Sequence, residues 1–143
     1  MIDGNTDDTI RDILSRTRRI ALVGASAKPW RASYEVMRFL VDRGYDVTPV
    51  NPALAGQTLH GRTVVATLAE ATPLEMVDVF RASSHAAAVT DQAIALGARI
   101  VWMQLGVIDH EAAARARAAG LTVAMDRCPV IEDRRIGPFG THH

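Results

Sequence analysis

The chain has 143 residues and a formal net charge of zero at pH 7, because sixteen basic residues balance sixteen acidic ones. This length is that of one ordinary domain with a sizeable core. The neutral balance argues against a long-range attraction to nucleic acid or to a membrane surface. A single cysteine, Cys128, excludes an internal disulfide and favours a location in the reducing cytoplasm. The longest apolar run, residues 100–107, is too short to span a bilayer, and the acidic first residues lack the pattern of a signal peptide.

The first elements along the chain are a short helix and a buried strand. Thr6 or Asp7 can cap the helix, because both side chains can accept a hydrogen bond from the first turn. Residues 20–23 then form a continuous apolar run that ends at Gly24. Such a run is typical of a strand that is buried on both faces of a sheet.

A second helix and a second strand follow. Ser33 is the predicted cap of the helix, and Gly44 ends it. Residues 45–50 are predicted to form the strand, which Asn51 and Pro52 stop. The segment 53–73 is irregular, with a short strand expected near Val64 and one helical turn before Pro73.

The second half of the chain repeats the same alternation of apolar runs and helical patterns. Apolar runs predict strands, and Ser83 or Ser84 and Asp109 are the expected helix caps. The predicted strands cover residues 76–80, 99–103 and 121–125, and the predicted helices end at Leu96 and Ala119, with a further helical stretch at 131–135.

Five apolar strands that alternate with helices predict an α/β fold. We expect a single Rossmann-like domain over residues 1–143, with a core at about 10–136 and a five-stranded parallel sheet covered by helices on both faces. In such sheets, ligands bind beyond the carboxyl ends of the strands, where the strand order reverses. Candidate site residues should therefore follow the predicted strands.

The segment after the first strand is the strongest candidate for a phosphate site. Gly24, Ala25 and Ser26 are small enough for a ligand to approach the backbone, and a helix N-terminus follows. Lys28 and Arg31 add positive charge, which suits a pyrophosphate. The alternative is a tight turn whose basic residues are simply solvated.

The second strand end argues against a dinucleotide. The G-x-G-x-x-G fingerprint is reduced to its first glycine, and Asn51 stands where an NAD site usually carries an acid. Asn51 and Pro52 are counted as candidate ligand contacts, although a plain turn explains them equally well.

Later strand ends supply further candidates. Phe80 and Arg81 could pack on an adenine or meet a phosphate, and the alternative is a buried aromatic beside an exposed arginine. Met103, Gln104 and Gly106 follow the fourth strand, where the alternative is an ordinary strand-to-helix turn.

The sequence shows no catalytic arrangement. The histidines have no metal-binding spacing, and His142 and His143 are expected to be disordered at the terminus. His85 is interpreted as a surface residue in a first helical turn. Cys128 has no base beside it in sequence, so a buried or half-buried thiol is favoured over a nucleophile.

Four stretches in order, VGASAKPWRASYEVMRFLVDRGYDVTPVNP, VDVFR, GARIVWMQLGV and AAGLTVAMDRC, closely resemble the small stand-alone members of the CoA-binding domain family. The resemblance covers roughly residues 10–136, and the same domain forms the N-terminal part of the succinyl-CoA synthetase alpha subunit. It implies that Gly24, Ala25 and Ser26 cradle the phosphates of coenzyme A. It further places the nucleotide against Phe80 and Arg81, and the pantetheine past Met103, Gln104 and Gly106.

Several functions remain open at this point. The favoured one is a non-catalytic module that binds CoA or an acyl-CoA, with a homodimer or a partner protein left open. The synthetase needs a second domain with a phosphorylated histidine, so we expect no ligase activity from this chain alone. The alternatives are an NAD(P)-dependent oxidoreductase, a thiol-based acyl-transfer or redox protein that uses Cys128, and a protein that keeps the fold without the ligand.

Overall fold

The computed structural model describes residues 2–140, so the expectation for His142 and His143 lies outside the described residues. The predicted apolar runs form one five-stranded sheet in the order β2-β1-β5-β6-β7, and every neighbouring pair is parallel. The α/β class and the parallel sheet are therefore confirmed. The strands are β1 (Arg19–Val23), β2 (Asp46–Val50), β5 (Met76–Val79), β6 (Ile100–Met103) and β7 (Thr122–Ala124).

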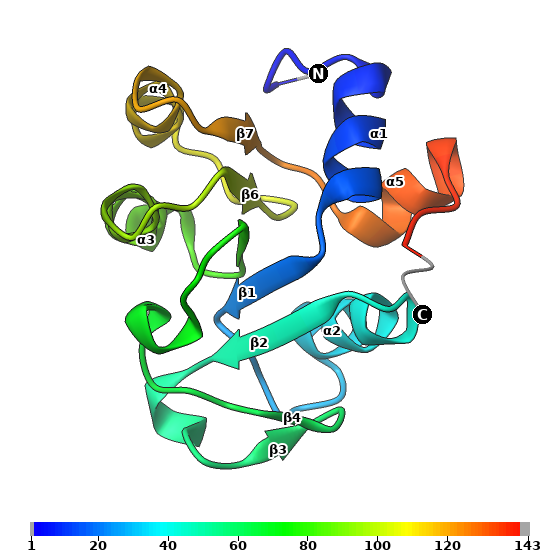
Figure 1. Ribbon diagram of the computed structural model, residues 1–143, viewed down its shortest axis with the longest axis vertical. Coiled ribbons are helices and arrows are strands. Elements are labelled where there is room, and N and C mark those ends of the chain that lie inside the picture. Colours follow the sequence, from blue (N-terminus) through cyan, green and yellow to red (C-terminus); the bar gives the residue numbers. More distant parts are fainter. Residues whose placement is uncertain (1, 141–143) are drawn as a thin grey trace.

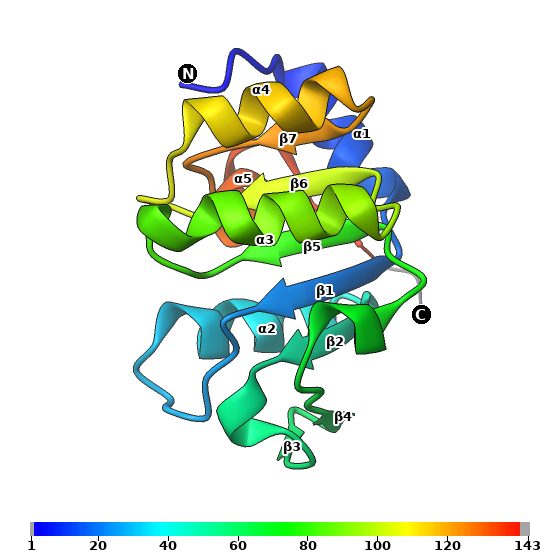
Figure 2. The ribbon, with the colours of Figure 1, turned by 90° about the vertical axis from the view of Figure 1, so that its left-hand side faces the viewer.

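Helices cover both faces of the sheet, as predicted. In Figure 1 the sheet is seen between two layers, with α3 and α4 on one side and α1, α2 and α5 on the other. Figure 2 looks onto the α3 and α4 layer, and all five strands of the sheet point the same way. The helices are α1 (Asp7–Arg16), α2 (Ala32–Asp42), α3 (Ser83–Ala95), α4 (His110–Ala118) and α5 (Pro129–Ile136).

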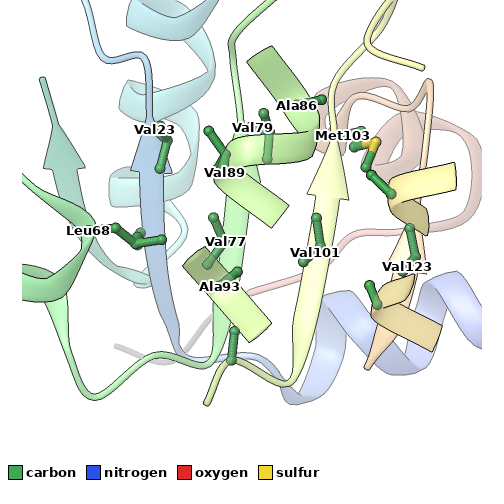
Figure 3. Packing of buried hydrophobic residues seen from close by; sticks show 14 of the residues in the cluster. Val23, Leu68, Val77, Val79, Ala86, Val89, Ala93, Val101, Met103 and Val123 are labelled. Atoms are coloured by element: carbon green, nitrogen blue, oxygen red, sulfur yellow. The ribbon is translucent and has the colours of Figure 1, made fainter. Parts of the chain in front are cut away.

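Apart from Arg19 at the start of β1 and Asp78 in β5, the central strands are apolar because each face of the sheet is buried under a helix layer. Along β5, Val77 and Val79 belong to the cluster beneath α3 and α4, whereas Met76 belongs to the cluster on the opposite face. All three side chains are fully buried. Figure 3 shows the first cluster, in which valines of β1, β5, β6 and β7 meet the small residues of α3. Burial on both faces removes the alternation that a half-exposed strand would show.

Two of the predicted helix caps are confirmed. The Thr6 hydroxyl accepts a hydrogen bond from the Thr9 N–H at 3.2 Å at the start of α1. The Asp109 carboxylate accepts from the Ala112 N–H at 3.0 Å at the start of α4. Both side chains satisfy N–H groups that the first helical turn leaves without an acceptor.

The predicted serine caps are wrong. Ser33 is buried inside α2, whose N-cap is Arg31 and has no side-chain cap bond. The N-cap of α3 is Ala82, again without a side-chain bond. The Ser83 hydroxyl instead accepts from the Ile108 N–H at 3.0 Å, which ties α3 to the segment that follows β6. The Ser83 hydroxyl is thus used in a tertiary contact and does not cap its own helix.

The irregular segment between β2 and β5 holds four short elements. A two-stranded hairpin is formed by β3 (Thr58–Leu59) and β4 (Arg62–Thr63), which confirms a short strand close to Val64. Single 3-10 turns flank it at η1 (Pro52–Leu54) and η2 (Leu68–Ala71). The turn η2 packs Leu68 against the α3 face of the sheet.

The strand order reverses next to β1. The chain passes from β1 to β2 on one side, then returns to add β5 on the other side of β1. The carboxyl ends of β1 and β5 therefore diverge into helices that lie on opposite faces of the sheet (Figures 1 and 2). This is the switch point at which α/β sheets hold their ligands.

The outer edge of β7 is covered by residues 3–5. A carboxylate oxygen of Asp3 accepts a hydrogen bond from the Met125 N–H at 3.0 Å. The Asn5 side chain donates to the Val123 carbonyl at 2.8 Å. Backbone groups that a sixth strand would use are thus bonded to side chains of the N-terminal segment.

Candidate functional site

A cleft of about 840 Å³ opens at the switch point. It lies at the carboxyl ends of β1, β2 and β5, between the N-terminus of α2 and one side of α3. Most of the predicted site residues line it, and they come from three strand ends that are far apart in sequence. These are Gly24, Ala25, Ser26, Lys28, Arg31, Asn51, Pro52, Phe80 and Arg81.

Gly24 is required by the packing of the two central strand ends. Its φ is +94°, and a β-carbon at this position would lie 2.3 Å from the Phe80 carbonyl oxygen. The Phe80 N–H donates to the Val23 carbonyl at 2.8 Å, so the ends of β5 and β1 are held together just before the two strands diverge. Only glycine tolerates this backbone angle together with so close a neighbour.

The loop after β1 is fixed to the end of β2. The N–H groups of Gly24 and Ala25 both point to the Val50 carbonyl, at 3.1 and 3.3 Å. The Asn51 side chain donates to the Ala25 carbonyl at 2.7 Å and accepts from the Ala53 N–H at 2.8 Å. Asn51 therefore serves as a turn residue as well as part of the cleft wall, and both ends of its amide are occupied.

Backbone donors remain at the start of α2. Within residues 2–140, the N–H groups of Ser26, Ala27, Ala32 and Ser33 have no hydrogen-bond acceptor, and all four residues line the cleft. The Ser26 hydroxyl accepts from the Lys28 N–H at 3.1 Å, which shapes the loop. Free N–H groups and the positive end of a helix dipole together favour an anion.

The charged side chains of the cleft are all basic. Lys28, Arg31 and Arg81 are exposed and line it, and no aspartate or glutamate does so. None of the three forms an ion pair in the described part of the chain, although most other arginines of this neutral protein are paired. Three unpaired cations without a carboxylate favour a ligand with several negative charges.

One wall of the cleft was not foreseen. His85, Ala88, Val89 and Gln92 line it from α3, at a spacing that puts them on one face of the helix. Sequence reasoning placed His85 in the first turn of this helix, which is correct, but gave it no place in a site. The signal that could have found this wall is the stripe of small and polar residues at positions 85, 88, 89 and 92.

The remaining predicted site residues do not line the cleft. Met103 is fully buried among the residues beneath α3 and α4, and Gln104 is 5% exposed. In the orientation that satisfies its amide, Gln104 donates to both carboxyl oxygens of Asp78, at 2.9 and 3.3 Å. Gly106 is exposed beside them, where its N–H donates to Asp126 at 2.8 Å. Contact of these residues with a ligand stays a prediction.

The carboxyl group of Asp78 lies at the centre of the sheet and is fully buried. Burial raises its pKa well above the usual value, because the surroundings disfavour the charged form. The side-chain amide of Gln104 is the polar group that contacts this buried carboxyl group. The pair links β5 to the residue that follows β6 at the carboxyl edge of the sheet.

Cys128 and Arg127 lie outside the cleft. The thiol is 8% exposed, stands at the N-cap of α5 and packs in the cluster that faces α1, α2 and α5. The Arg127 guanidinium is buried and paired with Asp3 and Glu132. Among residues 2–140, no group of three His, Cys, Asp or Glu side chains is arranged to hold a metal ion.

The fold and the position of the cleft define a Rossmann-like α/β domain. The chain belongs to the CoA binding domain family, whose sequence pattern matches residues 18–134. Uncharacterized protein YneT of Bacillus subtilis (strain 168) is 37% identical over 120 residues, which cover 83% of this chain and 87% of that protein. No helix in the described range 2–140 has the length and apolar character needed to cross a membrane.

Solved structures share the architecture over nearly the whole chain. A crystal structure of Prb, described as the PH1109 protein redesigned for binding, is 40% identical and covers all of both chains with a TM-score of 0.89. A hypothetical protein from Pyrococcus horikoshii OT3 is 42% identical, with 94% of each chain covered and a TM-score of 0.87. These similarities support the same fold for this chain and do not identify its ligand.

Proposed function

We propose that this protein binds coenzyme A or an acyl-CoA in the cleft at the switch point. The observation that carries the proposal is the set of three unpaired cations, Lys28, Arg31 and Arg81, in a cleft without a carboxylate. Coenzyme A carries a pyrophosphate and a 3′-phosphate, so its several negative charges match this set. Membership in the CoA binding domain family supports the same ligand.

The cleft favours CoA over a nicotinamide dinucleotide. A dinucleotide site usually offers an acid to the adenosine ribose hydroxyls at the end of the second strand. Here that position is Asn51, whose amide is already bonded to Ala25 and Ala53. A carboxylate would repel a 3′-phosphate, and its absence therefore suits CoA.

The proposed activity is binding without catalysis. Carboxylates and thiols are absent from the described lining of the cleft, and His85 is its one imidazole. The Cys128 thiol packs elsewhere, so no observation favours an acyl-transfer role. We propose a carrier, sensor or partner subunit of the reducing cytoplasm.

Thermal denaturation with CoA and with NAD tests this proposal. A ligand at 100 times its dissociation constant adds about 2.7 kcal/mol to the free energy of unfolding, which raises the Tm by several degrees for this length. We expect that rise with CoA and none with NAD. An equal rise with both ligands, or a rise with NAD alone, would overturn the proposal.

A charged substitution at the phosphate loop provides the matched variant. Ser26→Glu places a carboxylate beside the free N–H groups of α2, so it should abolish the CoA-dependent rise while the ligand-free protein keeps its Tm. Ser15→Glu, on the exposed side of α1, is the control and should respond to CoA like the wild type. Unchanged affinity in Ser26→Glu would place the phosphates elsewhere.

A further inference from the structure

His85 places an imidazole in the same cleft as three cations. It lies in the first turn of α3, is exposed, and lines the cleft together with Lys28, Arg31 and Arg81. Its backbone N–H donates to the Ala82 carbonyl at 2.8 Å. Its ring has no hydrogen bond or ion pair with any residue of the described range 2–140, so both ring nitrogens can meet a ligand.

The other histidines within residues 2–140 lie outside the cleft. The Nε2 atom of His60 is 3.0 Å from the Tyr34 carbonyl oxygen, in the turn of the hairpin. His110 is exposed at the start of α4 and resembles His85 in its place in a first helical turn. In the described lining of the cleft, His85 is therefore the side chain of the type that changes its charge between about pH 5 and pH 8.

The charges that face this imidazole across the cleft are positive. Lys28 and Arg31 come from the loop between β1 and α2, and Arg81 comes from the end of β5. The turn η1, residues 66–68 and the rest of the α3 wall add no charged side chain to the described lining. None of these neighbours favours the charged form of the imidazole. A bound polyanion does, because an opposite charge within about 4–6 Å stabilises that form.

We propose that His85 makes this cleft pH-sensitive, because its imidazolium form binds the anionic ligand more tightly than its neutral form. The proposal rests on the proposed binding of CoA and assigns a regulation to it. Coupling between two binding events is reciprocal, so the ligand also promotes the uptake of a proton. The affinity therefore rises as the pH falls, and the cleft releases its ligand more readily at alkaline pH.

CoA itself also titrates in this range. Its 3′-phosphate is a monoester, and the second ionisation of such a group occurs near about pH 6. That ionisation adds a negative charge to the ligand, so by itself it would strengthen binding as the pH rises. The two effects have opposite signs, and variants of His85 titrated with the same ligand separate them.

Two variants of His85 test the proposal. His85→Gln removes the titrating group, whereas His85→Lys keeps a positive charge from pH 6 to pH 8. Isothermal titration with CoA gives, for each protein, the ratio of the affinity at pH 6 to that at pH 8. We expect this ratio to be about fivefold higher in the wild type than in either variant. At pH 8, His85→Lys should bind CoA more tightly than His85→Gln. His110→Gln is the matched control and should keep the wild-type ratio.

Proton uptake provides a second readout. In buffers of different ionisation enthalpy at pH 7, the wild type should take up more protons per bound CoA than His85→Gln does. A wild-type ratio in His85→Gln would overturn the inference. An equal loss of affinity at both pH values would do the same, because it would show a contact with the ligand that does not titrate. If the wild-type protein binds CoA at neither pH, the proposed function itself fails.

Discussion

Arg127 and Asp3 form a bidentate ion pair inside the protein, although 124 positions separate them. The guanidinium donates from Nε and Nη2 to the two carboxylate oxygens at 2.6 and 2.9 Å, and both side chains are almost completely buried. Burial alone would raise the pKa of Asp3, but hydrogen bonds from Arg127, Asn5 and Met125 outweigh burial and lower it well below its usual value. The pair fastens the N-terminal segment to the residues that follow β7.

Asp3→Ala should destabilise the protein by about 3 kcal/mol, because it leaves the buried Arg127 guanidinium with Glu132 as its one carboxylate partner. It also removes the acceptor of the Met125 N–H. Urea denaturation measures the change. Asp8→Ala breaks an exposed pair with Arg11 and should cost less than about 1 kcal/mol. Similar small losses in both variants would show that the buried pair adds no stability.

Gly24→Ala should lower the free energy of unfolding by about 3 kcal/mol or more, because the new β-carbon meets the Phe80 carbonyl at a positive φ. Gly97→Ala is a matched control: its φ is +80°, but nothing lies within 4 Å of the new atom. The control should cost only about 1–2 kcal/mol for the backbone angle. Equal costs, measured by urea denaturation, would contradict a packing role for Gly24.

Arg81→Gln should weaken CoA binding about tenfold, because a charge-assisted hydrogen bond to a phosphate is lost. Its affinity should also depend less on salt than that of the wild type, since fewer charges are screened. Isothermal titration at two salt concentrations measures both effects. Arg134→Gln removes an exposed charge outside the cleft and should leave affinity and salt dependence as they were. An Arg81 variant that behaves like this control would remove Arg81 from the site.

Asp78→Asn should gain stability relative to the wild type as the pH rises. The folded-state pKa of Asp78 is raised by burial, so the unfolded chain ionises first, above about pH 4. Stability is therefore complete at lower pH and is lost as the pH rises towards the folded pKa, by up to about 1.4 kcal/mol per pH unit. Asparagine does not titrate and still offers an oxygen to Gln104. A stability difference that stays constant between about pH 4 and pH 8, measured by urea denaturation, would show that Asp78 does not titrate differently in the two states.

Cys128→Ser should change the affinity for CoA less than about threefold, because the thiol packs outside the cleft. A loss of stability of about 1 kcal/mol is expected, since a hydroxyl replaces a sulfur in an apolar cluster. Titration with CoA after reduction provides the affinity, and intact mass after oxidation provides a second readout. A mixed disulfide with CoA that disappears in the variant together with CoA binding would restore the thiol-based alternative.

The sheet and its helix layers were predictable because their signals are local. The apolar run at residues 20–23 and the mostly apolar segment 76–80, which Asp78 interrupts, needed only burial on both faces to become strands, and glycines marked most of the turns. The caps predicted at Ser33 and Ser83 are wrong, because both residues lie within the helices that they were predicted to cap. The Ser83 hydroxyl bonds to the segment after β6, a tertiary contact that the local sequence does not reveal. The hairpin of β3 and β4 has two residues in each strand, too few for a pattern to appear.

The candidate site was half predictable for the same reason. Residues at strand ends, such as Ser26 and Arg81, meet at one edge in any parallel sheet, so chain order alone brings them together. Ala88 and Gln92 come from the body of α3, and their place in the cleft depends on how far η2 stands from that helix. The side chain of Met103, which the sequence predicts beside a ligand, lies in the core, so its contact with a ligand stays a prediction.

The side chains of Asp3 and Asn5 also have a consequence for assembly. The Met125 N–H and the Val123 carbonyl are the groups that another molecule's strand would need in order to extend the sheet at β7. Because both are occupied from within the chain, a second copy can add a strand here only after residues 3–5 leave. The N-terminal segment therefore protects this edge strand against edge-to-edge aggregation. A protease that removed residues 3–5 would expose unpaired backbone groups on β7 to which another chain could bind.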